Sequence, residues 1–246
     1  MHSHSCHKSK AKRNSHRKEK RFLLFAVSMK VWFLTGNEGK VREAKKIFNQ
    51  YNFELEQMNL EFLEPQVDSL EEVAKEKMKQ AMAFLPEESD ALFVEDAGLF
   101  IEALNDFPGV FSSYALKTIG CQGIIRLLQH LRSEDISADS RLRKARFEAV
   151  SGIYFRGKME FFTGICPGKI SHEASGEDGF GFDPIFIPSD LDIDGNPAKT
   201  GEIGVISTHG ETFGQISSDS KELFSHRAKA VNKAISWLEI QREHHK

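Results

Sequence analysis

The segment 93–104 constrains the fold and the chemistry of this chain more than any other. It has the apolar character of a strand, yet it contains two adjacent carboxylates, Glu95 and Asp96, shortly before Gly98. Neighbouring acids concentrate negative charge, which costs free energy unless a cation or a proton relieves it. A hard divalent ion such as Mg2+ is the usual relief, because it binds one or two carboxylates together with a phosphate. A solvated strand end is the ordinary alternative, so the pair alone is only weakly suggestive.

Length and composition indicate a globular protein. The 246 residues are enough to bury one or two cores, and 40% are hydrophobic while 28% are charged. The longest apolar run near the N-terminus, 22–27, is too short to cross a bilayer, so we expect no membrane partner. Cys6, Cys121 and Cys166 form no CxxC pair, which argues against disulfides and suits a cytoplasmic location.

The charge is distributed unevenly along the chain. Residues 1–28 contain eight Lys or Arg and one Glu, about +7, whereas the remainder has 25 basic and 35 acidic residues, about -10. An acidic globular part is a poor general binder of nucleic acid, so we expect no specific nucleic-acid partner for it. A polyanionic ligand would need a local pocket of lysines and metal.

We interpret residues 1–28 as a basic, disordered extension and residues 29–246 as the folded domain. Three origins of the extension compete. It is a basic nucleic-acid or targeting tail, since transit peptides are also basic and rich in serine; it is a sequence added for expression; or translation begins at Met29, directly before the first strand. We favour the start at Met29.

Hydrophobic periodicity predicts a mixed β-sheet with helices on both sides, because strands and helices alternate before a hairpin intervenes. Strands are expected at 31–35, 92–96 and 99–104, with a hairpin of 145–155 and 159–170. Helices are expected at 41–51, 69–85, 119–131 and from 224 to the end, and a long loop at 188–211.

The turn Thr35-Gly-Asn-Glu-Gly-Lys40 opens the first of these helices. Glycines allow a phosphate to approach the backbone, the helix start offers free N–H groups, and Lys40 adds a positive charge. The spacing is neither that of a Walker A loop nor that of GxGxxG. Considered alone, an ordinary strand-to-helix turn is the more common explanation.

Lys77 falls on the apolar stripe of the helix 69–85, whereas Lys75 and Lys79 project elsewhere. A lysine on a buried face is unusual and requires a partner. The sequence therefore predicts an anionic group, from the protein or from a ligand, close to Lys77.

Three further motifs have both a functional and an ordinary interpretation. Glu64 in a Leu-Glu-Pro-Gln segment is either another metal ligand or a loop carboxylate of an acidic protein. The loop 176–184 ends on Asp183 and offers aromatic rings for stacking on a base, but is equally consistent with a glycine-rich turn. Ser225-His-Arg227 supplies donors for a purine carbonyl, or simply caps a helix.

Taken together and in order, these segments resemble the inosine triphosphate pyrophosphatase family, the XTP/dITP diphosphatases, and are most similar to its archaeal branch. The resemblance covers residues from about 29 to the C-terminus. The motifs that carry it are Thr35-Gly-Asn-Glu-Gly-Lys40, Leu63-Glu-Pro-Gln66, Val94-Glu-Asp-Ala-Gly-Leu99, Phe107-Pro-Gly109 with Ser113-Tyr114, Phe180-Gly-Phe-Asp-Pro184 and Ser225-His-Arg227.

The resemblance implies hydrolysis of deaminated purine nucleoside triphosphates (ITP, dITP and XTP) to the monophosphate and pyrophosphate, with Mg2+ as cofactor. It also implies an elongated α/β fold of two lobes with a central cleft, and a homodimer. The alternative is a catalytically weak nucleotide-binding sensor with the same pocket, against which the retained water-activating acid argues. A nucleic-acid protein led by its basic tail is the second rival.

The resemblance also assigns roles to residues. Asp96 would bind the metal and activate water, with Glu95 beside it, and Glu64 would be a second metal ligand. Lys77, or Lys79 in a competing alignment, would reach the phosphates. The other expected substrate contacts are Thr35, Gly36, Asn37, Lys40, Ala97, Phe180, Gly181, Phe182, Asp183, Lys221, His226 and Arg227. Ala97 replaces the small hydroxyl residue that is usual after the acidic pair, which removes one hydrogen bond.

Base selection has a physical rationale in this assignment. Hypoxanthine and xanthine present a carbonyl at position six, where adenine presents an amine. His226 and Arg227 would donate to the carbonyl and face another donor in adenine, and such a mismatch costs ~1–3 kcal/mol per contact. Guanine shares the carbonyl, so this argument leaves the discrimination against GTP to Asp183 or to the shape of the loop.

Overall fold

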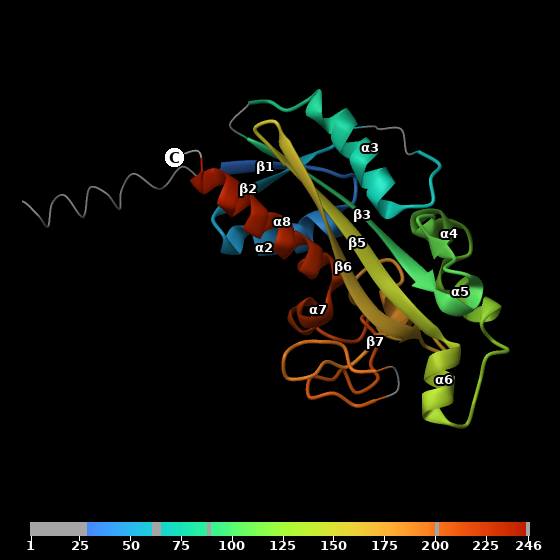
Figure 1. Ribbon diagram of the computed structural model, residues 1–246. Coiled ribbons are helices and arrows are strands. Elements are labelled where there is room, and N and C mark those ends of the chain that lie inside the picture. The colour runs from blue at the N-terminus through green and yellow to red at the C-terminus, as the bar shows by residue number, and fades with distance from the viewer. Residues whose placement is uncertain (1–28, 61–64, 88–89, 200–201, 245–246) are drawn as a thin grey trace, which may run out of the picture.

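The computed structural model describes residues 29–60, 65–87, 90–199 and 202–244, so the interpretation of residues 1–28 lies outside the described residues. Within these ranges, seven strands form one mixed sheet and helices pack on both of its faces (Figure 1). The predicted α/β architecture is confirmed. No described helix combines the length and the apolar character needed to cross a membrane.

The N-terminal lobe is a three-stranded parallel unit. Its elements are β1 (Met29–Leu34), α2 (Glu38–Gln50), β2 (Phe53–Met58), α3 (Leu70–Met82) and β3 (Ala91–Ile101). The strand order is β2-β1-β3, and β1 runs parallel to both neighbours. Phe33 and Phe93 pack towards α2 on one face, whereas Leu92 and Val94 pack towards α3 on the other.

This order creates a switch point at the end of β1. The chain leaves β1 through α2 to one neighbour and then crosses through α3 to the other, and the two helices lie on opposite faces. In open α/β sheets such a reversal leaves a crevice at the carboxyl end of the central strand. That end is Leu34, so the turn 35–40 lies at the mouth of the crevice.

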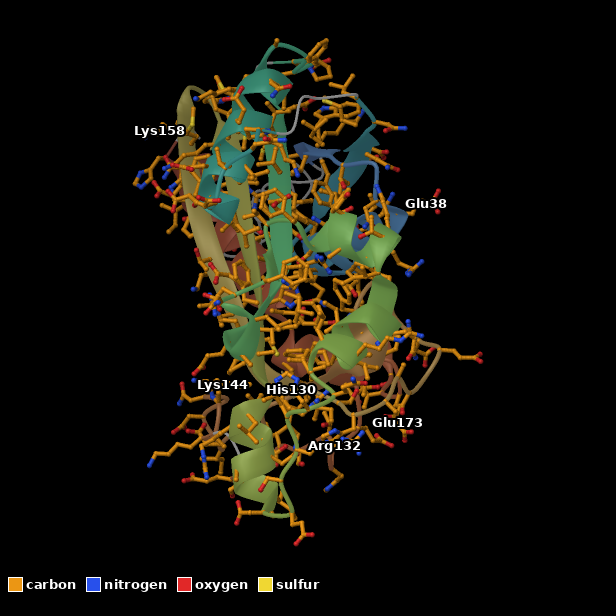
Figure 2. The ribbon with its side chains drawn as sticks, turned by 90° about the vertical axis from the view of Figure 1, so that its right-hand side faces the viewer. Glu38, His130, Arg132, Lys144, Lys158 and Glu173 are labelled. Atoms are coloured by element: carbon orange, nitrogen blue, oxygen red, sulfur yellow. The ribbon has the colours of Figure 1, made fainter. Side chains whose placement is uncertain are left out.

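A long antiparallel hairpin extends the sheet beyond this unit. β5 (Lys144–Phe155) pairs with β3, and β6 (Lys158–Ile170) pairs with β5 along their whole lengths. The hairpin gives the molecule its elongated shape, with Lys158 and Lys144 towards opposite ends of the long strands (Figure 2). The predicted hairpin is therefore confirmed.

The C-terminal helix α8 (His226–Glu243) packs across β5 and β6 beside α2. Lys229 Nζ and Lys233 Nζ donate to the carbonyl oxygens of Ile165 and Thr163, at 3.1 and 2.8 Å. These carbonyls belong to the part of β6 that pairs only with β5, so the two lysines cover an edge that would otherwise be open to another strand.

The second lobe surrounds the far end of the hairpin with a core of its own. It contains β4 (Pro108–Gly109), α4 (Ser112–Thr118), α5 (Gly120–Leu127), α6 (Ile136–Leu142), β7 (Phe186–Pro188) and α7 (Ser218–Phe224). Two short 3-10 helices, Glu102–Leu104 and Asp183–Ile185, complete it. The predicted loop 188–211 follows β7 and contains only isolated bridges in its described residues.

The strand prediction around the acidic pair was wrong in one respect. β3 is a single strand that pairs with β5 from Leu92 to Ile101, not two strands interrupted at Gly98. The glycine is there because β4 approaches closely: a Cβ at Gly98 would lie 2.3 Å from the carbonyl oxygen of Gly109. Residues 102–104, expected as strand, form a 3-10 turn.

Helix boundaries differ from the sequence prediction in the second lobe. The helix expected at 119–131 is α5, which spans only Gly120–Leu127. The φ of +61° at Gly120 separates α5 from the preceding α4. The C-terminal helix, expected from residue 224, is α8 and begins at His226. Ser225 ends the unpredicted α7 and caps α8 by accepting from Ala228 N. β2 and α6 were not predicted.

Candidate active site

The candidate site lies where the pairing of β3 is interrupted. β1 pairs with β3 only as far as Val94, and β4 resumes the pairing at Leu99. Residues 95–98 therefore have β5 on one side and a cavity on the other. The cavity has a volume of about 970 Å3 and lies between the two lobes.

Most of the predicted site residues line this one cavity. From the N-terminal lobe and β3 come Thr35, Gly36, Asn37, Lys40, Lys77, Asp96 and Ala97. From the second lobe and the start of α8 come Phe180, Gly181, Phe182, Asp183, Lys221, His226 and Arg227. Glu95 is the exception among the described residues, because it lies behind the wall, and Glu64 lies outside the described residues.

The turn after β1 presents the start of a helix to the cavity. The Asn37 side chain accepts from Lys40 N at 3.2 Å and caps α2, and Thr35 Oγ1 accepts from Asn37 N at 3.1 Å. The first residues of α2, from Glu38 to Lys40, line the cavity. The exposed Glu38 marks this turn in Figure 2. A helix start with a lysine is suited to bind phosphate.

The sequence predicted an anionic partner for Lys77, and in the structure this partner is Asp96. Lys77 Nζ lies 2.5 Å from Asp96 Oδ1, and the two side chains are 6% and 12% exposed. Lys79, the competing candidate, is 68% exposed and pairs with Glu76. The apolar periodicity of α3 therefore selected the lysine that lines the cavity.

Glu95 and Asp96 do not crowd each other, and the prediction that they do was wrong. Successive side chains of a strand point to opposite faces, so Asp96 faces α3 while Glu95 faces α2 and α8. Glu95 is fully buried, with Arg227 Nε 2.7 Å from its Oε2 and Lys40 Nζ 3.3 Å from its Oε1. Lys40 also donates to the Glu95 carbonyl oxygen at 3.3 Å.

The ionisation of this buried cluster is set by its partners. Burial raises the pKa of Glu95, but Arg227 and Lys40 outweigh it and hold its pKa below the usual value. Burial lowers the pKa of Lys40, although Glu95 and Asp96 oppose the shift. Glu95 is therefore a fixed anion that holds Lys40 from α2 and Arg227 from α8 in position.

Glu43 is a part of the site that the sequence analysis missed. It accepts from Lys221 Nζ at 2.9 Å and from Arg227 Nη1, so it joins α2 to α7 and α8. Burial raises its pKa, but Arg227 and Lys221 bring the pKa below the usual value. Its place three residues after Lys40, on the same helical face, was the available clue.

The glycine–aromatic loop folds around Asp183. Its Oδ2 accepts from Phe180 N and from Lys221 Nζ, both at 2.7 Å, and burial raises the pKa of this carboxyl despite Lys221. Gly179 and Gly181 have φ values of +79° and +69°, which residues with a side chain rarely adopt. The turn holds the Phe180 ring under two cations, 5.0 Å from Lys221 Nζ and 5.1 Å from Arg227 Cζ.

His226 is buried beside Arg227 and stacks on Phe147, with ring centroids 4.8 Å apart and an interplanar angle of 15°. Burial and the nearby cations, Arg227 first among them, hold its pKa well below 6.5. The ring is therefore neutral at pH 7 and offers one donor and one acceptor. Phe147, which supports it, was not predicted as a site residue.

The donor set at Asp96 fits a hard divalent ion shared with a phosphate. A carboxylate oxygen is the ligand that Mg2+ prefers, and the Lys77 ammonium already occupies a cation position next to it. Among the described residues, no group of three or more His, Cys, Asp or Glu side chains is arranged to hold a metal ion. The described side chains alone therefore do not form a complete cage at Asp96.

The arrangement combines three chemical capacities. A capped helix start and lysines bind negatively charged oxygens, a carboxylate faces the same cavity, and an aromatic ring lies at its other side. Such a site, in an α/β sheet with helices on both faces, is typical of proteins that bind phosphorylated ligands with a planar ring. Nucleotides are ligands of this kind.

The comparisons place the chain more narrowly. Residues 31–237 match the model of the Ham1 family. The dITP/XTP pyrophosphatase of Thermococcus kodakarensis is 39% identical over 211 residues, covering 85% of this chain and 97% of that protein. The dITP/XTP pyrophosphatase of Methanopyrus kandleri is 40% identical over 210 residues, covering 85% and 96%. The Ham1 protein of Staphylococcus aureus superposes with a TM-score of 0.63 at 26% identity, covering 86% and 99%. The chain belongs to the Ham1 family.

Proposed function

We propose that this protein hydrolyses deaminated purine nucleoside triphosphates (ITP, dITP and XTP) to the monophosphate and pyrophosphate and so removes them from the nucleotide pool. The dITP/XTP pyrophosphatases that it resembles over nearly their whole length support this activity. The observation that carries the proposal is the meeting of Asp96 and the cavity-facing cations Lys40, Lys77, Lys221 and Arg227 around one cavity.

We assign the triphosphate to the N-terminal lobe. Thr35, Asn37 and the first turn of α2 would hold phosphate oxygens together with Lys40, and Lys77 would reach them from α3. A triphosphate brings about four negative charges to an acidic protein, so these charges must be compensated locally. The site residues that face the cavity provide this compensation where the rest of the chain does not.

Asp96 is the residue to which we assign the proton of the attacking water. A carboxylate within hydrogen-bonding distance of the water can accept that proton as the oxygen attacks the α-phosphorus. Asp96 would hold Mg2+, and the ion would supply polarisation of the phosphoryl group and make water more acidic. Glu64 is the second ligand that the resemblance suggests. Glu95 would act through Lys40 and Arg227, as a positioning residue, because it does not line the cavity.

The base would lie against Phe180 in the second lobe. Arg227 uses Nε and Nη1 for Glu95 and Glu43, so its remaining donors, with the N–H of His226, are those we assign to the purine carbonyl. Adenine would oppose these donors with an amine, which costs ~1–3 kcal/mol per mismatched contact. We propose Asp183, with Phe182 and Gly181, as the other side of the base pocket.

Four further assignments belong to this proposal. Mg2+ is the cation we propose, on the grounds of the oxygen donor at Asp96. We propose a cytoplasmic enzyme, which agrees with the free thiols of Cys121 and Cys166. We propose a homodimer, as the family resemblance implies, and sedimentation velocity would measure it. The folded domain would comprise residues 29–246.

The test is a panel of ITP, XTP, dITP, GTP and ATP with Mg2+, in which pyrophosphate and orthophosphate release are measured separately. We expect pyrophosphate from the deaminated purines. Orthophosphate alone, or equal rates on ATP and ITP, would refute the assignment.

The Asp96→Asn variant tests the mechanism. We expect turnover to fall at least about 100-fold, as for the loss of a general base, while equilibrium binding of ITP persists. Asp219→Asn is the matched control, because Asp219 is 86% exposed on α7 and does not line the cavity. Unchanged turnover in Asp96→Asn would remove Asp96 from the mechanism.

A further inference from the structure

The Lys77 ammonium lies against the carboxylate that we propose as the metal ligand, Asp96. Its ammonium is 2.5 Å from Asp96 Oδ1, and both side chains line the cavity although they are almost inaccessible to solvent. An ammonium and a divalent ion cannot share one carboxylate oxygen at contact distance without strong repulsion, because both are positive and little water screens them. A divalent ion held by either oxygen of Asp96 would therefore be repelled by the Lys77 ammonium unless that ammonium moves.

Of three other described acids at the cavity or behind its wall, two are already paired with cations, and Glu38 is exposed at the start of α2. Glu95 faces the opposite side of β3 and is held by Arg227 and Lys40. Asp183 is held by Lys221. No group of three or more ligating side chains is arranged to hold a metal ion among the described residues. We therefore assign to the nucleotide and to water a share of the oxygens around an ion at Asp96.

A triphosphate supplies what Lys77 would need in order to leave Asp96. The cavity opens towards the capped start of α2 and Lys40, where we place the phosphates, and Lys77 projects into the same cavity. A phosphate oxygen there offers the ammonium a new anionic partner, so moving from the carboxylate to the phosphate leaves no buried charge uncompensated.

We propose that Lys77 is a counter-ion switch that makes metal binding depend on the nucleotide. Without nucleotide, the ammonium neutralises Asp96 and excludes a free divalent cation. When the triphosphate binds, the ammonium transfers to a phosphate oxygen, and Asp96 becomes a ligand for the cation that accompanies the nucleotide. The inference rests on the proposed function of the cavity, and it adds an order of binding to it.

The proposal has a quantitative consequence. Two ligands that favour the same state raise each other's affinity by the same factor, which is typically about 5- to 150-fold. The wild-type protein should therefore bind Mn2+, used as a probe for Mg2+, much more tightly with a non-hydrolysable ITP analogue than alone. Replacing Lys77 by an uncharged side chain should raise the affinity for Mn2+ alone and reduce this dependence.

The experiment is a titration of free Mn2+ by electron paramagnetic resonance, with the metal alone and with α,β-methylene-ITP. Lys77→Met keeps length and helical propensity but removes the charge. Lys79→Met is the matched control on the same helix, since Lys79 is exposed and pairs with Glu76. Lys77→Met should bind Mn2+ alone about 5- to 150-fold more tightly than the wild type, and Lys79→Met should not differ from it. A second substitution, Asp96→Asn in the Lys77→Met background, should abolish the gain.

Two results would overturn the switch. One is equal affinity of wild type and Lys77→Met for Mn2+ alone; the other is wild-type binding of Mn2+ that is as tight without the analogue as with it. The second comparison uses only the wild type, so it can refute the switch even if the variant folds poorly. ITP hydrolysis by the wild type without these Mn2+ effects would refute the switch alone, whereas the Mn2+ effects without any hydrolysis would refute the proposed activity alone.

Discussion

The buried Glu95 provides the sharpest test of how the site is held together. In Glu95→Gln the side chain keeps its shape and loses its charge, while Arg227 and Lys40 stay in place. Glu95 has no exposed surface, and its two ion pairs are 2.7 and 3.3 Å long. Removing one partner of a buried ion pair costs ~3–5 kcal/mol, because the remaining charge lacks compensation. Arg227 keeps its pair with Glu43, so we expect the lower end, about 3 kcal/mol.

The pH dependence of the effect has a definite sign. The folded pKa of Glu95 lies below 4.5, so its contribution to stability is fully present above that value. It is lost as the pH falls through the folded pKa, because the unfolded chain binds the proton more readily. The difference in the free energy of unfolding between wild type and Glu95→Gln should therefore be constant near neutrality and shrink in acid below pH 4.5.

Urea unfolding followed by far-ultraviolet circular dichroism measures both quantities. A loss of about 3 kcal/mol also corresponds to a fall in melting temperature of about 6–12 °C for a chain of this size. Glu102→Gln is the control, because Glu102 is 67% exposed in its pair with Lys144, and such pairs contribute ~0–1 kcal/mol. Stability within about 0.5 kcal/mol of wild type, or a difference that persists unchanged in acid, would refute the reasoning.

Two further predictions concern the start of α8. A Cβ at Gly164 would lie 2.0 Å from the carbonyl oxygen of His226 and 2.6 Å from Ala230 N. Gly164→Ala should therefore destabilise the folded protein by ~1–3 kcal/mol, as thermal melts would show. It should also displace the start of α8 and so raise KM for ITP in steady-state kinetics. An unchanged KM would contradict this prediction, because it would mean that a displacement at the start of α8 does not affect the substrate site. The folded protein keeps His226 neutral, because its pKa lies well below 6.5. As the pH falls below 6.5, this histidine binds a proton in the unfolded chain but not in the folded one, so stability decreases. Wild type should lose up to ~1.4 kcal/mol per pH unit from this residue, and His226→Gln should lack that slope in urea titrations at pH 5, 6 and 7; equal slopes would contradict it.

Local patterns predicted the parts of the site that depend on one element at a time. The stripe of α3 placed Lys77 on the buried face and required an anion beside it, and the structure supplies Asp96. Likewise the glycine-rich segment after β1 predicted a turn into a helix, and in the structure Asn37 caps that helix. In each case the decisive contact lies within a few residues, or follows from a single periodicity.

Contacts between distant segments were beyond such reasoning. The helical pattern places Glu43 on the surface of α2. It belongs to the site only because it pairs with Lys221 and Arg227, which lie 178 and 184 residues further along the chain. The two acids were interpreted as crowded because their adjacency in sequence was considered without the alternation of a strand. Gly98 was taken as the end of a strand, whereas the approach of Gly109 explains it.

The interrupted pairing of β3 has a consequence for Ala97. Backbone groups of alternate residues point to alternate edges of a strand, and both Glu95 O and Leu99 N point to the edge away from β5, towards Lys40 and Ser112. The amide of Ala97, midway between them, therefore points the same way, into the cavity that Ala97 lines. A main-chain donor survives any exchange of side chain except proline. Although Ala97 lacks the side-chain hydroxyl usual at this position, its backbone N–H remains as a donor towards the cavity.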